Sequence, residues 1–350
     1  MTFPSEPSSR RTWLRRCGGL GLPTLAQLTA LSTFPALMTR PAAQAPSGAS
    51  GSSAHGVPMA QVATGTLERW LDLPSRHLPT RPVDIWIPPG FKAGQPYRVL
   101  CMHDGQMLFD ARTTWNRQAW MAHDAVHGLQ QSGRWLPTLV LGIWNREHHR
   151  YAEYYPEKAL AFAPASARDG YVQAEARGRP LADAYLRFIV EDLLPRVESR
   201  WGPRAGSHGA MVAGASMGGL ISLYALCEYP TVFSGAAGLS THWVSVAASR
   251  SDLDKRQQDL SRAFLAYLEQ HLPPAGQHRL WVDRGDDALD SLYEPGLRQF
   301  ETLLRARGYG PDDAAVRVFP GTGHRESDWS GRLAQALAFI GPGGGGGASA

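Results

Sequence analysis

The sequence predicts an α/β protein with a mostly parallel central sheet of about eight strands and helices on both faces. Strand-like and helix-like segments alternate along the chain, as they do in sheets built from β-α-β units. Several strand-like segments are continuous apolar runs, which is typical of strands that helices cover on both faces. Residues 60–340 contain no internal linker or repeat, so we expect a single domain there.

The expected strands are short apolar runs that end at turn-forming residues. In chain order they are Thr66–Leu71, Val83–Ile87, Arg98–His103, Thr138–Trp144, Ala210–Ala215, Gly235–Leu239, Arg279–Asp283 and Ala315–Phe319. Apolar residues that recur every three or four positions predict helices over Ala182–Ser199, Leu220–Glu228, Leu292–Arg307 and Arg332–Ile340. We expect Pro195 to end or kink the first of these, because proline has no amide hydrogen to donate.

Composition and charge exclude several classes of protein. The chain has 350 residues, of which 43% are hydrophobic and 19% charged, and this excludes a disordered chain or a collagen-like fibre. The formal net charge is +4, but residues 1–45 carry five arginines and one acid. The remainder carries 30 basic and 30 acidic side chains. No overall field attracts phosphates to the domain, and we expect no nucleic-acid partner.

The N-terminus has the features of an export signal. Ser9–Leu14 (SRRTWL) resembles a twin-arginine motif, Cys17–Leu37 is mildly apolar, and Ala43–Ala45 offers small residues for cleavage. We therefore expect a signal peptide over residues 1–45 and a periplasmic or secreted protein without a stable membrane anchor. A disordered Ser/Gly linker over 46–59 and a flexible Gly-rich tail over 341–350 are expected to flank the domain.

A candidate nucleophile follows the strand Ala210–Ala215. The sequence Gly214-Ala215-Ser216-Met217-Gly218 is a G-x-S-x-G motif between a strand and a helix, the context in which a serine is held exposed on a tight turn. Side chains at Gly214 and Gly218 would be expected to collide with the neighbouring backbone. The Met217 amide, at the start of the helix, can then donate to a developing oxyanion.

The other members of a Ser-acid-His triad follow the last two strands. His324 lies in a Gly-rich loop after the final strand, where that chain order places the base. The loop after the preceding strand offers four carboxylates, from which we select Asp290 as the acid, with Asp287 as the alternative. After the strand Arg98–His103, Gly105 would let the backbone approach a substrate, and the Gln106 amide is the expected second oxyanion donor.

These residues, together with further blocks, carry a resemblance to a known family. The blocks are Asp104–Asp110 (DGQMLFD), Gly142–Asn145 with Glu153–Pro156, Gly214–Leu220, Leu239–Trp243, and Pro320–His324 with Trp329. Over residues 60–340 the chain resembles the putative-esterase family of α/β-hydrolases, which includes feruloyl, acetyl-xylan and siderophore esterases. The resemblance implies the α/β-hydrolase fold, Ser216 as nucleophile, His324 as base, and no cofactor or metal. The acid loop departs from the usual pattern, since Asp286 follows Gly285 where this branch often has threonine.

The resemblance implies a serine esterase that works through an acyl-enzyme. The substrate is expected to be a small-molecule or polysaccharide-linked ester, such as an acylated polysaccharide or a siderophore lactone. An acyltransferase with the same triad and a non-catalytic binding relative are the alternatives. Candidate substrate contacts, which border the active edge of the expected sheet, are Asp104, Gly105, Trp144, His242 and Trp243.

Overall fold

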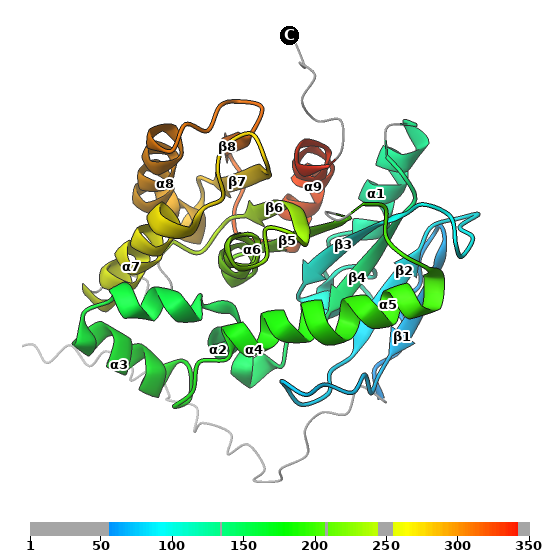
Figure 1. Cartoon of the computed structure of the whole chain (residues 1–350), viewed down its shortest axis with the longest axis horizontal. Coiled ribbons are helices and arrows are strands. Elements are labelled where there is room, and N and C mark those ends of the chain that lie inside the picture. Colours follow the sequence, from blue (N-terminus) through cyan, green and yellow to red (C-terminus); the bar gives the residue numbers. More distant parts are fainter. Residues whose placement is uncertain (1–55, 134, 207–208, 244–254, 342–350) are drawn as a thin grey trace, which may run out of the picture. The chain divides into compact units, whose positions relative to one another are not determined.

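The computed structural model describes residues 56–133, 135–206, 209–243 and 255–341. Within these ranges eight strands form one sheet in the order β1-β2-β4-β3-β5-β6-β7-β8 (Figure 1). The strands are β1 (Thr66–Trp70), β2 (Val83–Ile87), β3 (Arg98–His103), β4 (Thr138–Ile143), β5 (Ala210–Ala215), β6 (Phe233–Leu239), β7 (Arg279–Gly285) and β8 (Ala314–Phe319). Strand β2 runs antiparallel to both β1 and β4, and the remaining pairs are parallel. The predicted mostly parallel sheet is confirmed.

Helices cover both faces of this sheet. The α-helices are α1 (Ala122–Gln131), α2 (Arg150–Tyr154), α3 (Ala165–Ala174), α4 (Ala182–Arg187), α5 (Leu194–Trp201), α6 (Met217–Glu228), α7 (Lys255–His271), α8 (Glu294–Ala306) and α9 (Glu326–Ile340). Short 3-10 turns are η2 (Gly105–Met107), η3 (Glu147–His149), η4 (Glu157–Phe162) and η6 (Ala288–Tyr293). Helices α1 and α9 pack with one apolar layer of the sheet, and α2 to α8 pack with the layer on the opposite face (Figure 1).

The helix over residues 182–201 departs from the prediction at Pro195. The helical path does not end there, because α4 continues through a π-helical segment, η5 (Phe188–Leu193), directly into α5. Pro195 follows directly on the π-helical segment, where the regular helical hydrogen-bond pattern is already interrupted. The local irregularity takes the form of the π-helical turn.

Helix α9 begins at Glu326, six residues before the predicted start. Its first two turns are largely polar, so the apolar spacing that marks a helix is absent from the sequence there. Glu326 and Asp328 lie in the first turn, where acidic side chains favour the positive end of the helix dipole.

The predicted signal peptide and most of the predicted linker and tail lie outside the described residues. No helix in the described ranges is long and apolar enough to cross a membrane. Cys101 is buried, Cys227 is half-buried, and both are free thiols. Burial raises the pKa of the Cys101 thiol to about 12, so this group is not reactive at neutral pH.

Candidate active site

Ser216 occupies the tight turn between β5 and α6. Its backbone has φ 58° and ψ −125°, a conformation that is strained for a residue with a side chain. The Ser216 amide donates to the Leu239 carbonyl at 3.0 Å, and the Ser216 carbonyl accepts from the His242 amide at 3.1 Å. These two bonds tie the turn to the end of β6 and hold the strained backbone in place.

The glycines around this turn have different roles. A Cβ at Gly214 would lie 2.8 Å from the Gly218 backbone, so residue 214 must be glycine, as predicted. A Cβ at Gly218 would meet only ordinary contacts, the nearest at 3.5 Å, and the predicted collision there is wrong. The second crowded position is Gly219, where a Cβ would come within 2.6 Å of Thr241 Oγ1.

His324 and Asp290 meet on the loops that follow β8 and β7. His324 Nδ1 lies 2.7 Å from Asp290 Oδ1. Asp290 Oδ2 accepts a hydrogen bond from the Gly285 amide at 2.7 Å and another from the Ser240 hydroxyl. Burial alone would raise the pKa of Asp290, but these hydrogen bonds outweigh burial and hold the pKa below its ordinary value. Asp290 is therefore a fully buried carboxylate that stays ionised and orients one nitrogen of His324.

The other carboxylates of the same loop have separate partners. Asp283 belongs to β7 and pairs with the buried Arg332 at 3.0 Å. Asp286 accepts a hydrogen bond from the Gly321 amide at 2.7 Å. Asp287 is exposed, and its amide donates to the Thr322 carbonyl at 3.1 Å. Of the two candidate acids, Asp290 is the one whose carboxylate contacts His324.

Ser240 was not singled out by the sequence, yet it holds the acid in place. Its hydroxyl accepts hydrogen bonds from Trp329 Nε1 at 2.9 Å and Arg332 Nη2 at 2.8 Å, and donates to Asp290. The edge of Trp329 also meets the His324 ring, with centroids 4.9 Å apart and an interplanar angle of 87°. The one sequence signal was the position of Ser240 directly after β6, at the carboxyl edge of the sheet.

Tyr293 is a second residue that sequence reasoning missed. It is fully buried, its hydroxyl lies 2.8 Å from His242 Nδ1, and it forms a hydrogen bond with the Ser216 side chain. Its ring packs edge-on against His324, with centroids 5.7 Å apart. Burial raises the pKa of the Tyr293 hydroxyl well above its ordinary value, so the hydroxyl remains a donor. Its spacing from Asp290, three residues along one 3-10 turn, was the available signal.

The two predicted oxyanion donors lie at the starts of short helical segments. Met217 is the first residue of α6, so its amide has no acceptor inside that helix. Gln106 lies in η2, and its side-chain Oε1 accepts from the Asn145 amide at 3.2 Å. A Cβ at Gly105 would overlap the Gly142 backbone, and the approach of a substrate to Gly105 stays a prediction. Its lack of a side chain lets η2 pack on β4.

Asp104 lies beside the serine turn, with its carboxylate already neutralised. A Cβ at Gly218 would lie 3.6 Å from Asp104 Oδ2. Arg150 donates to both carboxylate oxygens at 2.8 Å, and Asn145 donates to Oδ1 at 2.6 Å. Burial by itself would raise the pKa of Asp104. Arg150 and Asn145 lower it by more than burial raises it, so the pKa lies below its ordinary value. The ion pair with Arg150 therefore leaves little net negative charge beside the Ser216 turn.

Three further candidate substrate contacts, His242, Trp243 and Trp144, differ in their surroundings. His242 is buried at the Ser216 turn and faces Tyr293. Trp243 is 2% exposed and packs against Phe264 and Phe300, so its ring has no free face for a substrate. Trp144 lies under the Arg69 guanidinium at 4.6 Å, and its Nε1 donates to Asp84 at 3.0 Å. Trp243 therefore packs inside the fold, whereas Trp144 is half-buried and its contact with a substrate stays a prediction.

In the part of the chain that the structure describes, no group of three or more His, Cys, Asp or Glu residues could hold a metal. The groups that the structure brings together at this edge of the sheet are the Ser216 turn, the His324 imidazole held by the Asp290 carboxylate, and backbone amides. A strained serine at the end of a parallel strand, in a sheet of this order, defines the class of α/β-hydrolases.

Comparison with known proteins identifies the family. Residues 79–340 match the family model described as "Putative esterase", and the chain belongs to that family. The protein is accordingly an enzyme, a serine carboxylic-ester hydrolase. A Bacillus subtilis (strain 168) protein named YbbA, itself described as uncharacterized, is 22% identical over 258 residues, covering 73% of this chain and 90% of YbbA.

Two of the solved structures with a similar fold are described as esterases. The enterobactin esterase FES from Shigella flexneri has a TM-score of 0.52 and 17% sequence identity, with 82% of this chain covered. The present chain spans 62% of that protein's length. A structure described as ferulic acid esterase has a TM-score of 0.55 and 18% identity, covering 80% of this chain and 98% of its own. At these identities the likeness establishes the α/β-hydrolase fold.

Proposed function

We propose that the protein is an exported serine esterase in which Ser216 is the nucleophile, His324 the base and Asp290 the acid. The observation that carries this proposal is the 2.7 Å contact between His324 Nδ1 and the buried Asp290 carboxylate, at the edge of the sheet that bears the strained Ser216 turn. With Nδ1–H donated to Asp290, His324 Nε2 is left free to accept a proton.

The reaction proceeds in two steps. His324 Nε2 accepts the Ser216 hydroxyl proton as Oγ attacks the ester carbonyl, and the Met217 and Gln106 amides stabilise the tetrahedral oxyanion. His324 then gives this proton to the departing alkoxide, leaving an acyl group on Ser216 Oγ. Water, deprotonated by His324, attacks the acyl carbon, and the acid product leaves as Ser216 regains its proton. Asp290 keeps the imidazolium charge stabilised in both steps.

The substrate class is an ester whose alcohol or acyl part is large and polar, such as an acylated polysaccharide or a siderophore lactone. Supporting this proposal, structures described as an enterobactin esterase and a ferulic acid esterase share the fold. A fluorophosphonate probe tests the nucleophile. We expect one adduct per chain, located on Ser216 by peptide mass spectrometry and blocked by prior heating. An adduct on another residue, or no adduct on folded protein, would remove the proposed triad.

The export part of the proposal is supported by the twin-arginine pattern at Arg10 and Arg11. In a bacterial host, the full chain is expected in the periplasmic fraction, and the Arg10→Lys, Arg11→Lys double variant in the cytoplasmic fraction. Equal distribution of the two proteins would contradict twin-arginine export without affecting the proposed chemistry.

A further inference from the structure

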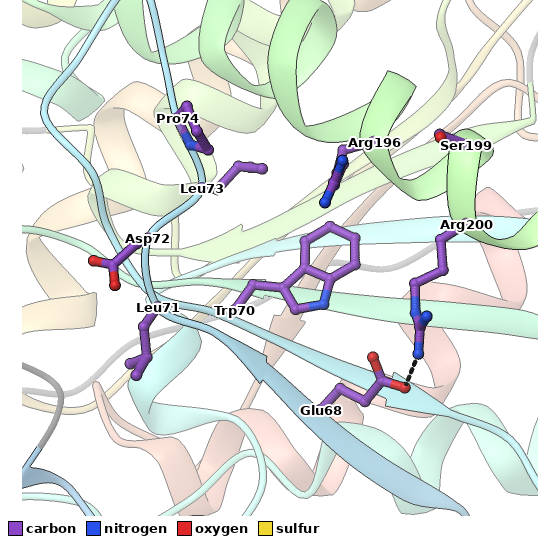
Figure 2. A pocket seen from close by; sticks show the side chains of 9 residues that line it. All are labelled: Glu68, Trp70, Leu71, Asp72, Leu73, Pro74, Arg196, Ser199 and Arg200. Atoms are coloured by element: carbon purple, nitrogen blue, oxygen red, sulfur yellow. Dashed lines mark hydrogen bonds and ion pairs between the residues drawn. The ribbon is translucent and has the colours of Figure 1, made fainter.

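A groove of about 680 Å³ lies between the edge strand β1 and helix α5, away from the Ser216 turn. One wall is formed by β1 and the residues that follow it, and the other by the exposed side of α5 (Figure 2). The chemically distinctive lining residues are Glu68, Trp70, Asp72, Arg196, Ser199 and Arg200. Nothing in the proposed esterase mechanism uses this groove.

The sequence spacing explains why these side chains gather. Glu68 and Trp70 are two residues apart in β1, so the extended strand directs both side chains to the same side. Positions 196, 199 and 200 are three and four residues apart and share one side of α5. The opposite side of α5 is buried and holds Leu194, Val197 and Trp201.

Trp70 provides a rigid flat surface in this groove. Its indole stacks on Trp201 with ring centroids 5.7 Å apart and an interplanar angle of 4°. Because Trp201 is only 6% exposed, it fixes the Trp70 ring from behind. Figure 2 shows the ring in the middle of the groove, between Arg196 on one side and Glu68 on the other. An apolar ring face bordered by polar groups suits a ligand that is apolar on one face and polar at its rim.

The charged side chains that line the groove determine which kind of ligand can bind there. The Glu68 carboxylate and two guanidinium groups border the ring, so the lining carries charges of both signs. Arg200 and Glu68 form an ion pair at 2.8 Å, and Arg196 extends toward Trp70 and pairs with no described acid (Figure 2). A purely apolar ligand would strip water from these charges without replacing it. A neutral molecule rich in hydroxyl groups, with an apolar ring face, satisfies all of them because hydroxyls both donate and accept.

The strand register places Trp70, on the β1 wall of the groove, level with the end of the sheet that carries Ser216. Because β2 is antiparallel to both of its neighbours, β1 runs in the same direction as β4, β3 and β5. Trp70 pairs with Val83, Val83 with Ile143, and Ile143 with His103, at the carboxyl end of β3. Strand β5, next to β3, carries the serine turn at that same end. Four strand spacings separate β1 from β5, about 19 Å, which a short oligosaccharide can span.

We propose that the groove around Trp70 is a surface site for a neutral saccharide chain, and that it holds a glycan at the edge of the sheet where its ester meets Ser216. The binding itself is independent of the proposed function, and only the presence of the ester on the glycan rests on it. The ring stacks on a sugar face, Arg196 and Ser199 donate to hydroxyl oxygens, and the Glu68 carboxylate accepts from hydroxyl groups.

Affinity electrophoresis of the full chain tests this site, in gels that contain soluble arabinoxylan, galactomannan, mixed-linkage β-glucan or the anionic polymer polygalacturonate. We expect retardation by at least one neutral polymer. Trp70→Ala and Arg196→Ala should each weaken it about tenfold or more, since a truncated aromatic or arginine anchor has effects of this size. Trp115→Ala, which removes an 84% exposed tryptophan elsewhere, is the matched control and should bind normally.

Hydrolysis of p-nitrophenyl acetate by the same variants separates the possible failures. Arg196 is exposed, and Arg196→Ala should keep its turnover of this small ester while losing polysaccharide binding. Retardation by no neutral polymer, retention by polygalacturonate alone, or equal binding by Trp70→Ala, Arg196→Ala and Trp115→Ala would overturn the proposal. If the wild-type protein binds a neutral polymer but does not hydrolyse the ester, the proposed function is refuted and the proposed saccharide site is not.

Discussion

Replacing Asp290 with asparagine tests the geometry of the acid. The carboxylate holds three donors, with Oδ1 facing His324 Nδ1 and Oδ2 facing the Gly285 amide and the Ser240 hydroxyl. In Asp290→Asn the amide oxygen must stay on the Gly285 side, because an NH₂ group there would face an N–H donor 2.7 Å away. The NH₂ group therefore faces His324 Nδ1, which must then accept.

A histidine that accepts at Nδ1 carries its proton on Nε2 and cannot take the proton of Ser216. The expected cost is about 10⁴-fold in kcat, the size seen when this substitution fixes the wrong tautomer. Asp287→Asn is the matched control, since Asp287 is exposed and its carboxylate makes no contact with His324; its kcat should stay within about twofold of the wild type.

The assay is hydrolysis of p-nitrophenyl butyrate at neutral pH, with circular dichroism to confirm that both variants are folded. An Asp290→Asn enzyme that keeps more than a tenth of wild-type kcat would refute the tautomer argument. A loss in Asp287→Asn as large as that in Asp290→Asn would show that the loop as a whole, and not one carboxylate, supports activity.

Three further outcomes are expected. Arg150→Met removes the ion-pair partner of Asp104 beside the proposed oxyanion site. The variant should lower the free energy of unfolding by about 1–3 kcal/mol in urea titrations, and it should also lower kcat. An unchanged kcat would contradict the neutralising role of Arg150. Gly214→Ala sets a Cβ 2.8 Å from the Gly218 backbone and should cost about 1–3 kcal/mol of stability and most activity, whereas wild-type melting and turnover would contradict the crowding argument. The pKa values of Asp104 and Asp290 are lowered in the folded state, so their stabilising contribution is present above the ordinary carboxyl pKa of about 4 and lost as pH falls through the lowered folded values. Urea midpoints measured from pH 6 to pH 2.5 should therefore fall below about pH 4, and less steeply in Asp104→Asn; equal slopes would exclude Asp104 as a contributor.

The sequence predicted the sheet well because its strands are buried on both faces. The bounds predicted for β2, β3 and β5 match the structure, and the other five differ by at most two residues at either end. The Ser216 turn was equally predictable, since a G-x-S-x-G motif between a strand and a helix has a strong local signal. Of the two outcomes predicted for Pro195, an end of the helix is wrong, because a π-helical segment with no simple sequence signature precedes the proline and the helical path continues; a kink stays a prediction.

The sequence could propose Asp290 as the triad acid but could not decide between it and its neighbours, because the loop has four carboxylates within eight residues and the local sequence favours none of them. What separates them is tertiary: Asp283 faces Arg332, Asp286 faces the Gly321 amide, and Asp290 faces His324. Ser240 and Tyr293 were missed for the same reason, since their contacts with Asp290 and His242 form only in the folded chain and their sequence positions are weak signals. Trp243 looked like a substrate contact because it follows a strand at the active edge, yet Phe264 and Phe300 enclose it.

The central claim is that Ser216 is the nucleophile of an esterase, and turnover of p-nitrophenyl acetate and butyrate tests it most directly. Wild-type protein should hydrolyse both esters, and Ser216→Ala, matched for folding, should lose about 10⁴-fold or more in kcat. Turnover by Ser216→Ala at a rate near that of the wild type, or no turnover by folded wild-type protein, would contradict the account.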